Sequence, residues 1–413
     1  MLVVTFPGQG SQRPGMGQPW VGHRSWELVE DASDASGRDV ASLLLDAGAD
    51  ELTATRNAQL ATFTLSLVVL DALEGLGIEP QACAGHSLGE YTALVAAGAL
   101  SFEEGVQLVT ERGNAMQAAA DQQPGTMAAL TGVEDDVAEA ACQRAEAEVW
   151  VANYNAPGQV VIAGTAESVA RAAELAKQMG ARKALPIPVG GAFHTPLMAP
   201  ARDRLRKTLT EVTFAAPEVP VVANVDARAH AHAAEWPGLL SAQLCSPVRW
   251  RQTLEVLGTL DPDDTLDLIE AGPGGVLTGL ARRSLPDARA ATVATPQDLD
   301  TIVERLTSGQ AHSPAGGEHL YVAERLVVSP VTGLFQPDPL VDAVPGPGGA
   351  QTFGDAPSVA GISTRLEVGA RVGTVGDTEV RSAFSGALMR VLAFPGERVV
   401  RGQPVAWLRA DPS

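Results

Sequence analysis

Short and long apolar runs alternate through the first 300 of the 413 residues. Residues 2–6 form a short run that ends at a Pro-Gly pair, which predicts a buried strand. The run at 61–73 is too long for a strand and predicts a buried helix. Residues 82–84 predict a second strand, and the helical pattern of 88–97 follows after a glycine. A strand, a sharp turn and a helix in succession indicate an α/β fold.

Residues 126–188 follow a different pattern, in which short strands and helices alternate. The predicted strand, helix, strand, strand, helix and strand lie at 126–131, 134–147, 149–153, 159–163, 166–179 and 182–187. This βαββαβ order is typical of a ferredoxin-like unit. Short apolar runs like those at 2–6 and 82–84 resume at 219–225 and 265–270 and predict further strands of the α/β fold. We therefore expect a ferredoxin-like subdomain (126–188) inserted into an α/β core with a hydrolase-like parallel sheet (1–125 and 189–307).

The helical pattern disappears from the last hundred residues. Residues 308–317 are rich in Gly, Ser and Ala and predict a linker. Short strands broken by Gly and Pro follow, and a loose stretch at 341–361 interrupts them. The pattern predicts a small all-β domain over 318–413.

Composition and charge exclude several classes of protein. With 45% hydrophobic and 19% charged residues, the chain is globular rather than disordered. The net charge of −20 argues against a partner that is nucleic acid or an anionic membrane, since either needs a basic patch. The apolar runs fall short of the ~20 residues that a membrane span requires.

The cysteines and the N-terminus bear on the cellular compartment. The three cysteines, Cys83, Cys142 and Cys245, are odd in number and far apart, which argues against a disulfide framework and against a zinc site. The first apolar run has no basic flank and does not resemble a signal peptide. We expect a cytoplasmic protein without a bound metal.

One pentapeptide has the form G-x-S-x-G, namely Gly85-His86-Ser87-Leu88-Gly89. Its glycines permit the tight turn that exposes a serine Oγ at the end of a strand, and the following helix points backbone N–H groups toward the same place. The alternative is a glycine-bounded helix start without chemistry. The preceding strand and the following helix favour a nucleophile at Ser87.

A nucleophilic serine needs a base, and the best candidate among the seven histidines is His194. It follows the strand predicted at 182–187 and has small neighbours, which suits a catalytic loop. His86 lies inside the pentapeptide, His312 lies in the linker, and His230 and His232 lie in an Ala-rich loop. A satisfied structural histidine remains the alternative.

Seven motifs, in order and with family spacing, resemble the malonyl-CoA:acyl carrier protein transacylases. They are FPGQGSQ at 6–12, GHSLGEY at 85–91, RGNAMQ at 112–117, NAPGQVV at 155–161, GAFH at 191–194, QLCSPVRW at 243–250 and EAGPG at 270–274. The resemblance extends over residues 1 to about 290. It implies transfer of malonyl from malonyl-CoA to the phosphopantetheine thiol of an acyl carrier protein, without a bound cofactor.

The same resemblance implies the roles of the site residues. Ser87 would attack the thioester, and His194 would take its proton. The backbone N–H groups of Gln9 and Leu88 would form the oxyanion hole. Gln243 occupies the position from which a main-chain carbonyl orients the histidine, so no catalytic Asp or Glu is expected.

Three further residues are implied in substrate binding. Arg112 would hold the malonyl carboxylate as a bidentate pair, although its sequence context alone favours a helix-surface arginine near Glu104 and Glu111. Gln59 matches a position near the substrate. Phe193 is a bulky residue beside the base, as in family members that select malonyl over methylmalonyl.

Residues 326–335 and 382–408 resemble biotinyl/lipoyl carrier domains, which implies a barrel-sandwich fold. Such domains attach their cofactor to a lysine at a hairpin tip. Here the hairpin at 375–382 is shortened, and no lysine follows Lys207. We expect a degenerate carrier domain with neither biotin nor lipoate, serving as a spacer or stability module. Docking of a synthase or carboxylase partner is the alternative role.

Two other functions are alternatives to acyl transfer. A thioester hydrolase that clears carrier proteins could use the same frame, but it has no use for the cation of Arg112. A non-catalytic scaffold is the third hypothesis. The resemblance implies that the transferred malonyl serves fatty-acid or polyketide synthesis.

For the acidic carrier protein the sequence offers one dense basic cluster, formed by Arg202, Arg204, Arg206 and Lys207.

Overall fold

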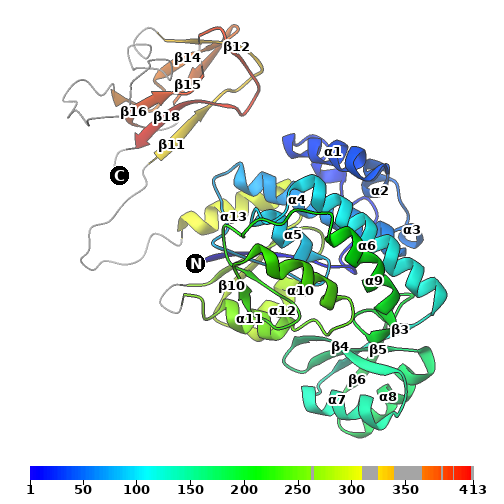
Figure 1. Cartoon of the computed structure of the whole chain (residues 1–413). Coiled ribbons are helices and arrows are strands. Elements are labelled where there is room, and N and C mark those ends of the chain that lie inside the picture. Colours follow the sequence, from blue (N-terminus) through cyan, green and yellow to red (C-terminus); the bar gives the residue numbers. More distant parts are fainter. Residues whose placement is uncertain (262–264, 309–323, 339–364, 383–384, 394, 411–413) are drawn as a thin grey trace. The chain divides into compact units, whose positions relative to one another are not determined.

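The computed structural model describes residues 1–261, 265–308, 324–338, 365–382, 385–393 and 395–410 (Figure 1). The chain divides into two compact units, Met1–His312 and Ser313–Ser413. Most of the linker predicted at 308–317 and the whole loose stretch predicted at 341–361 lie outside the described residues.

A six-stranded sheet forms the centre of the first unit, in the order β10-β9-β1-β2-β7-β8. Its strands are β1 (Leu2–Phe6), β2 (Ala82–Gly85), β7 (Val221–Val222), β8 (Ala229–His230), β9 (Asp267–Ala271) and β10 (Arg289–Val293). All neighbours are parallel except β7 and β8. The strand predicted at 219–225 is wrong in length, because the chain leaves the sheet after Val222 and brings Asn224 beneath Ser87.

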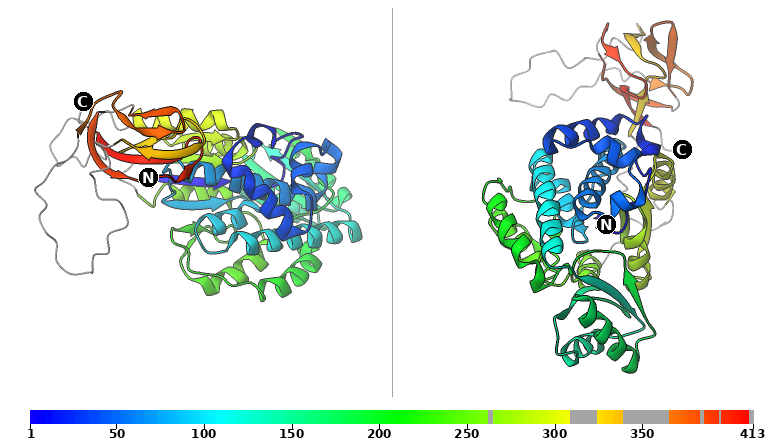
Figure 2. Two further views of the ribbon diagram at one scale, coloured as in Figure 1. Left: turned by 90° about the horizontal axis from the view of Figure 1, so that it is seen from above. Right: turned by 90° about the vertical axis from the view of Figure 1, so that its right-hand side faces the viewer.

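Helices surround this sheet (Figures 1 and 2). They are α1 (Glu27–Ser36), α2 (Val40–Leu45), α3 (Ala49–Thr53), α4 (Thr55–Glu74), α5 (Gly89–Ala96), α6 (Phe102–Gln122), α9 (Ala199–Leu209), α10 (Trp236–Gln243), α11 (Trp250–Leu257), α12 (Val276–Ser284) and α13 (Pro296–Ser308). Helix α4 packs along α6 and is longer than the predicted 61–73. Several of its polar residues, Asn57 and Gln59 among them, are buried as well, so the apolar run underestimates the length of the helix. No helix within the described residues is long and apolar enough to cross a membrane.

The segment between α6 and α9 forms a second sheet, in the order β4-β5-β3-β6. Its elements are β3 (Thr126–Thr131), α7 (Asp135–Arg144), β4 (Val149–Ala156), β5 (Gln159–Gly164), α8 (Ala166–Gln178) and β6 (Lys183–Ile187). The neighbouring strands are all antiparallel. Alternate residues face opposite ways: Leu130 and Ile162 pack under α7 and α8, whereas Met127 and Val161 line a cavity shared with the main sheet.

Within its described residues, the second unit contains two four-stranded antiparallel sheets, in the orders β11-β18-β16-β13 and β15-β14-β12-β17. Its strands are β11 (Glu324–Val328), β12 (Gly333–Pro337), β13 (Arg365–Leu366), β14 (Arg371–Val375), β15 (Thr378–Arg381), β16 (Gly386–Val391), β17 (Arg398–Val399) and β18 (Pro404–Ala410). The hairpin between β14 and β15 has a two-residue turn that starts at Gly376, whose φ is +59°. A glycine at the first turn position suits this tight connection.

We expect the first unit to fold without the second. A fragment of residues 1–308 ends where α13 ends and keeps both sheets of the first unit. Purified from the same host as the full chain, it should be soluble and should unfold in one cooperative transition, followed by circular dichroism. Aggregation of the fragment, or loss of the transition, would show that the second unit is integral to the fold.

Candidate active site

Ser87 occupies a sharp turn between β2 and α5, with a φ of +54° that non-glycine residues rarely adopt. The turn has no room for side chains at its flanks. A Cβ on Gly85 would lie 1.8 Å from the carbonyl of Gly89, and one on Gly89 would lie 2.0 Å from the carbonyl oxygen of Phe6. Both glycines are therefore required for the turn to pass between the strand and the helix.

The Ser87 hydroxyl lies against His194. Its Oγ is 2.7 Å from His194 Nε2, and His194 Nδ1 is 2.9 Å from the main-chain carbonyl oxygen of Gln243. Because a carbonyl only accepts hydrogen bonds, Nδ1 must carry the proton and Nε2 is left as the acceptor. His194 itself has a φ of +62° in the loop between β6 and α9.

Burial and charge keep His194 neutral. Desolvation, followed by the positive charge of Arg112, lowers the pKa of His194 to about 3. The imidazole is therefore unprotonated at Nε2 near neutral pH, which is the state that can take a proton from Ser87.

Arg112 reaches the same hydroxyl from α6 and is only 1% exposed. Its Nη2 donates to Ser87 Oγ at 3.0 Å and to Gln243 Oε1 at 2.9 Å, and its Nη1 donates to Gln59 Oε1 at 2.7 Å. The guanidinium also lies 5.2 Å from the ring centre of Tyr91. Within the described chain no carboxylate forms an ion pair with it. The site thus holds a buried cation beside the serine.

The helix-surface alternative for Arg112 is wrong, because the residue points inward. Glu111, the neighbour that could have paired with it, binds Arg204 of α9 instead. Arg202 of the predicted basic cluster likewise pairs with Asp203. The cluster is therefore partly neutralised, and only its last two members, Arg206 and Lys207, form no ion pair within the described residues.

Two backbone N–H groups beside Ser87 are unused. Within the described chain, neither the amide of Gln9 nor that of Leu88 donates to another protein group. Gly8 allows the two segments to approach, since a Cβ there would lie 2.5 Å from the carbonyl oxygen of His86. Such unused donors are the type of group that stabilises an oxyanion.

A cavity of about 330 Å³ opens at Ser87 between the two sheets of the first unit. Gln9, Arg112, Phe193 and His194 are among its lining residues. Gln59 is fully buried and is not itself a lining residue, but it binds two residues that are, Arg112 and Met116. In the described part of the chain, no group of His, Cys, Asp or Glu is placed to hold a metal ion.

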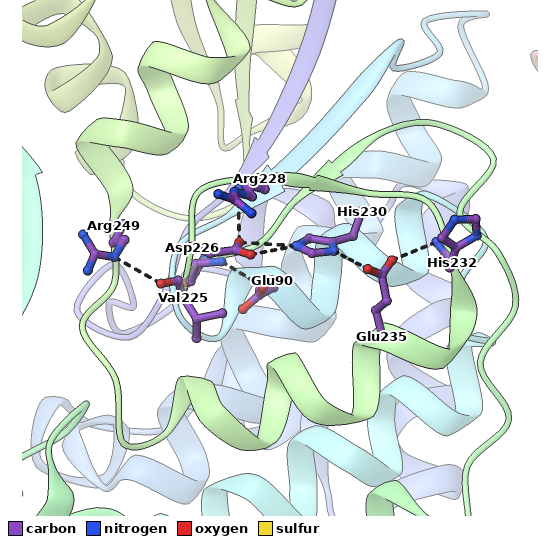
Figure 3. A network of polar contacts seen from close by, with 9 residues as sticks. Glu90, Val225, Asp226, Arg228, His230, His232, Glu235 and Arg249 are labelled. Carbon is purple, nitrogen blue, oxygen red and sulfur yellow. Dashed lines mark hydrogen bonds and ion pairs between the residues drawn. The ribbon is translucent and has the colours of Figure 1, made fainter.

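The other histidines near the site have structural partners. His86 is fixed by Asn155 Oδ1 at 3.0 Å and Asn153 Nδ2 at 3.2 Å. His230 lies between the carboxylates of Asp226 and Glu235 (Figure 3).

Sequence reasoning missed two residues of the site. Asn224 Oδ1 accepts the Ser87 N–H at 2.7 Å, and the buried carboxylate of Glu90 binds Gln243 and Asn224. A signal existed for Asn224, which is a polar residue near the end of the strand predicted at 219–225. Glu90 stands one residue beyond the pentapeptide, but its position in a helical pattern does not show which way it points.

Comparison with known families identifies the class of this protein. Residues 3–302 match the model of the acyl transferase domain. A malonyl CoA-acyl carrier protein transacylase of Bacillus subtilis (strain 168) is 39% identical over 310 residues, which are 74% of this chain and 97% of the relative. The transacylase of Escherichia coli (strain K12) is 40% identical over 73% of this chain and 99% of its own length. This chain belongs to the malonyl CoA-acyl carrier protein transacylase family.

Solved structures agree with this assignment. An acyl carrier protein S-malonyltransferase from Vibrio cholerae has a TM-score of 0.69 and 40% identity, over 73% of this chain and 99% of that one. A malonyl-transacylase solved with its type II PKS acyl-carrier protein has a TM-score of 0.70 and 37% identity, over 74% of this chain and 99% of that one. The family match ends at residue 302, so the second unit lies outside it.

We expect Arg112→Met to raise the pKa of His194, because it removes the second cause of the lowering. The ring resonances of labelled histidine, with His194 assigned through His194→Gln, should show no titration of His194 from about pH 5 to pH 8 in the wild type. In the variant the titration should move upward in pH. Arg144→Met, on the outer helix α7, is the control. An unchanged His194 titration in Arg112→Met would rule out the coupling.

Proposed function

We propose that this chain transfers malonyl from malonyl-CoA to the phosphopantetheine thiol of an acyl carrier protein through a malonyl ester on Ser87. The observation that carries the proposal is the buried Arg112 guanidinium, 3.0 Å from Ser87 Oγ and without a carboxylate partner among the described residues. A buried charge without a counter-ion is costly, so the site favours an acyl group that brings its own carboxylate.

In the first half-reaction His194 Nε2 takes the proton of Ser87 as the Oγ attacks the thioester carbonyl. The negative charge moves to the carbonyl oxygen, where the N–H groups of Gln9 and Leu88 stabilise it. The C–S bond then breaks, and the thiol of coenzyme A leaves with the proton from His194. The Gln243 carbonyl stabilises the imidazolium that forms in between, in place of the carboxylate of a hydrolase triad.

In the second half-reaction the carrier-protein thiol gives its proton to His194 and attacks the ester carbonyl. The same two amides hold the oxyanion, and the C–O bond to Ser87 breaks as His194 returns the proton to Oγ. Phe193 narrows the cavity beside His194, which we propose favours malonyl over its methyl-branched analogue. Arg206 and Lys207 of α9 are the exposed cations that we propose for carrier docking.

The alternative of a thioester hydrolase has no support among the relatives, which are named transacylases. The buried cation also argues against it, because a hydrolase of neutral acyl chains would have to desolvate Arg112 without compensation.

For the second unit we propose a degenerate carrier domain of the barrel-sandwich type. Its antiparallel sheets and the two-residue turn at Gly376 support this, because so short a hairpin presents no lysine. A spacer role and docking of a synthase or carboxylase are both compatible with it. We also propose a cytoplasmic location, since Cys83, Cys142 and Cys245 are all free thiols.

Replacing Ser87 by Ala should abolish malonyl loading, because it removes the attacking oxygen. Intact-mass spectrometry after exposure to malonyl-CoA should show one malonyl adduct on the wild type and none on the variant. Ser284→Ala, at the end of α12, is the matched control and should keep the adduct. An adduct on Ser87→Ala would exclude Ser87 as the nucleophile.

Replacing Arg112 by Ala should shift selectivity from malonyl toward neutral acyl groups. A hydrogen bond to a charged group contributes about 1.5–3 kcal/mol, so the malonyl-to-acetyl ratio of kcat/KM should fall at least about tenfold. Loading rates with the two thioesters measure the ratio, with Arg144→Ala as the control. A ratio within about twofold of the wild type would leave Arg112 without a role in specificity.

A further inference from the structure

A buried carboxylate without a role in the mechanism above lies three residues after the nucleophile Ser87. Glu90, on the first turn of α5, is 1% exposed. Its two oxygens bind different partners: Oε1 accepts the backbone N–H of Asn224 at 3.0 Å, and Oε2 accepts a hydrogen bond from Gln243 Nε2.

Each of these partners holds a reacting residue in place. The Asn224 side chain accepts the Ser87 N–H at 2.7 Å and donates to the Gly85 carbonyl at 2.7 Å, so it connects both sides of the turn. The Gln243 side chain donates to the Ser87 carbonyl at 2.8 Å and accepts from Arg112 Nη2 at 2.9 Å. The Gln243 backbone carbonyl accepts from His194 Nδ1.

Only an acceptor at position 90 is compatible with this arrangement. Gln243 uses both N–H bonds of its amide, toward Glu90 and Ser87, and turns its oxygen toward Arg112. A flipped amide would set its oxygen against two acceptors and its N–H groups against the guanidinium. The carboxylate of Glu90 therefore fixes the orientation in which Gln243 can hold Arg112.

We propose that Glu90 is a positioning residue for acyl transfer, whose carboxylate holds Asn224 and Gln243 and through them Ser87, Arg112 and His194. This inference rests on the proposed function. It adds a role for a residue outside the chemical steps. It predicts that the loss of Glu90 slows acylation by both charged and neutral acyl groups, because Ser87 and His194 act on both.

The surroundings of Glu90 indicate that its carboxylate is maintained at a cost in stability. Burial raises its pKa to about 7, whereas the hydrogen bonds from Asn224 and Gln243 and the charge of Arg112 act to lower it. Asp226, on the loop above it (Figure 3), raises the pKa slightly further. A raised carboxyl pKa means that folding favours the protonated form, so stability falls as the pH rises from the unfolded value of 4.5 through 7.

The test compares Glu90→Gln with Glu270→Gln. Glu270, on β9, is also 1% exposed with a pKa raised by burial, and it binds the Thr278 N–H rather than the site. Rapid mixing with excess malonyl-CoA or acetyl-CoA, followed by intact-mass spectrometry, separates the rate constant of Ser87 acylation from the fraction of enzyme that can be loaded. Denaturant unfolding at pH 5 and pH 8 measures the pH dependence of stability.

We expect the acylation rate constant of Glu90→Gln to fall at least about tenfold with both thioesters, because one charge-assisted hydrogen bond that positions the site is lost. The fraction of enzyme that can be loaded should stay complete. Glu270→Gln should acylate within about twofold of the wild type. Both variants should lose less stability than the wild type between pH 5 and pH 8.

Three results would overturn the inference. One is a wild-type rate constant in Glu90→Gln, and another is a reduced loaded fraction at an unchanged rate constant, which a merely structural role would give. If Glu90→Gln cannot be purified, Glu90→Asp takes its place, because it keeps the charge but is one methylene too short to hold both partners. A wild-type acylation rate constant in Glu90→Asp would be the third overturning result. Absence of any acylation in the wild type would instead refute the proposed function, and the inference would fall with it.

Discussion

Burial of the Arg112 guanidinium beside Ser87 is the constraint on which the rest of the site depends. An unpaired cation in a protein interior is strongly disfavoured, and here it is satisfied by amide oxygens and an aromatic ring instead of an ion pair. Neutral acceptors hold the guanidinium in place without cancelling its charge. The site therefore stays electropositive toward an incoming carboxylate. Burial, together with the same charge, lowers the pKa of His194 and keeps its imidazole unprotonated.

This arrangement explains why the histidine is oriented by a carbonyl. A carboxylate at His194 Nδ1 would lie close to Arg112 and would compete with the substrate for it. The carbonyl of Gln243 fixes the tautomer through one acceptor and adds no negative charge. The buried carboxylate of Glu90 lies behind Gln243 and close enough to Arg112 to influence the pKa of its guanidinium, but the two form no ion pair.

Local patterns in the sequence predict the elements that local interactions determine. The glycines of the pentapeptide, the strand before them and the βαββαβ order at 126–188 could all be inferred from neighbouring residues. Arg112 and Gln243 needed the resemblance to a family, because a charged residue in an amphipathic helix looks the same whether it faces water or a site. Asn224 and Glu90 were missed, since their role depends on bringing together residues more than 130 positions apart. Hydrogen-bond networks of this kind have no sequence period.

The stability of the site and its chemistry make opposing demands on the same atoms. Ser87 and His194 both have positive φ, and Glu90 and Arg112 are both buried with pKa values displaced toward their neutral forms. Strained backbone and buried charge persist only where the surrounding packing holds them. The surroundings meet this requirement: α4 is buried over almost its whole length, and α5 is wedged against β1 and β2 so closely that Gly85 and Gly89 admit no Cβ. The packing of this frame therefore holds a strained serine, a neutral imidazole and a buried cation together in one site.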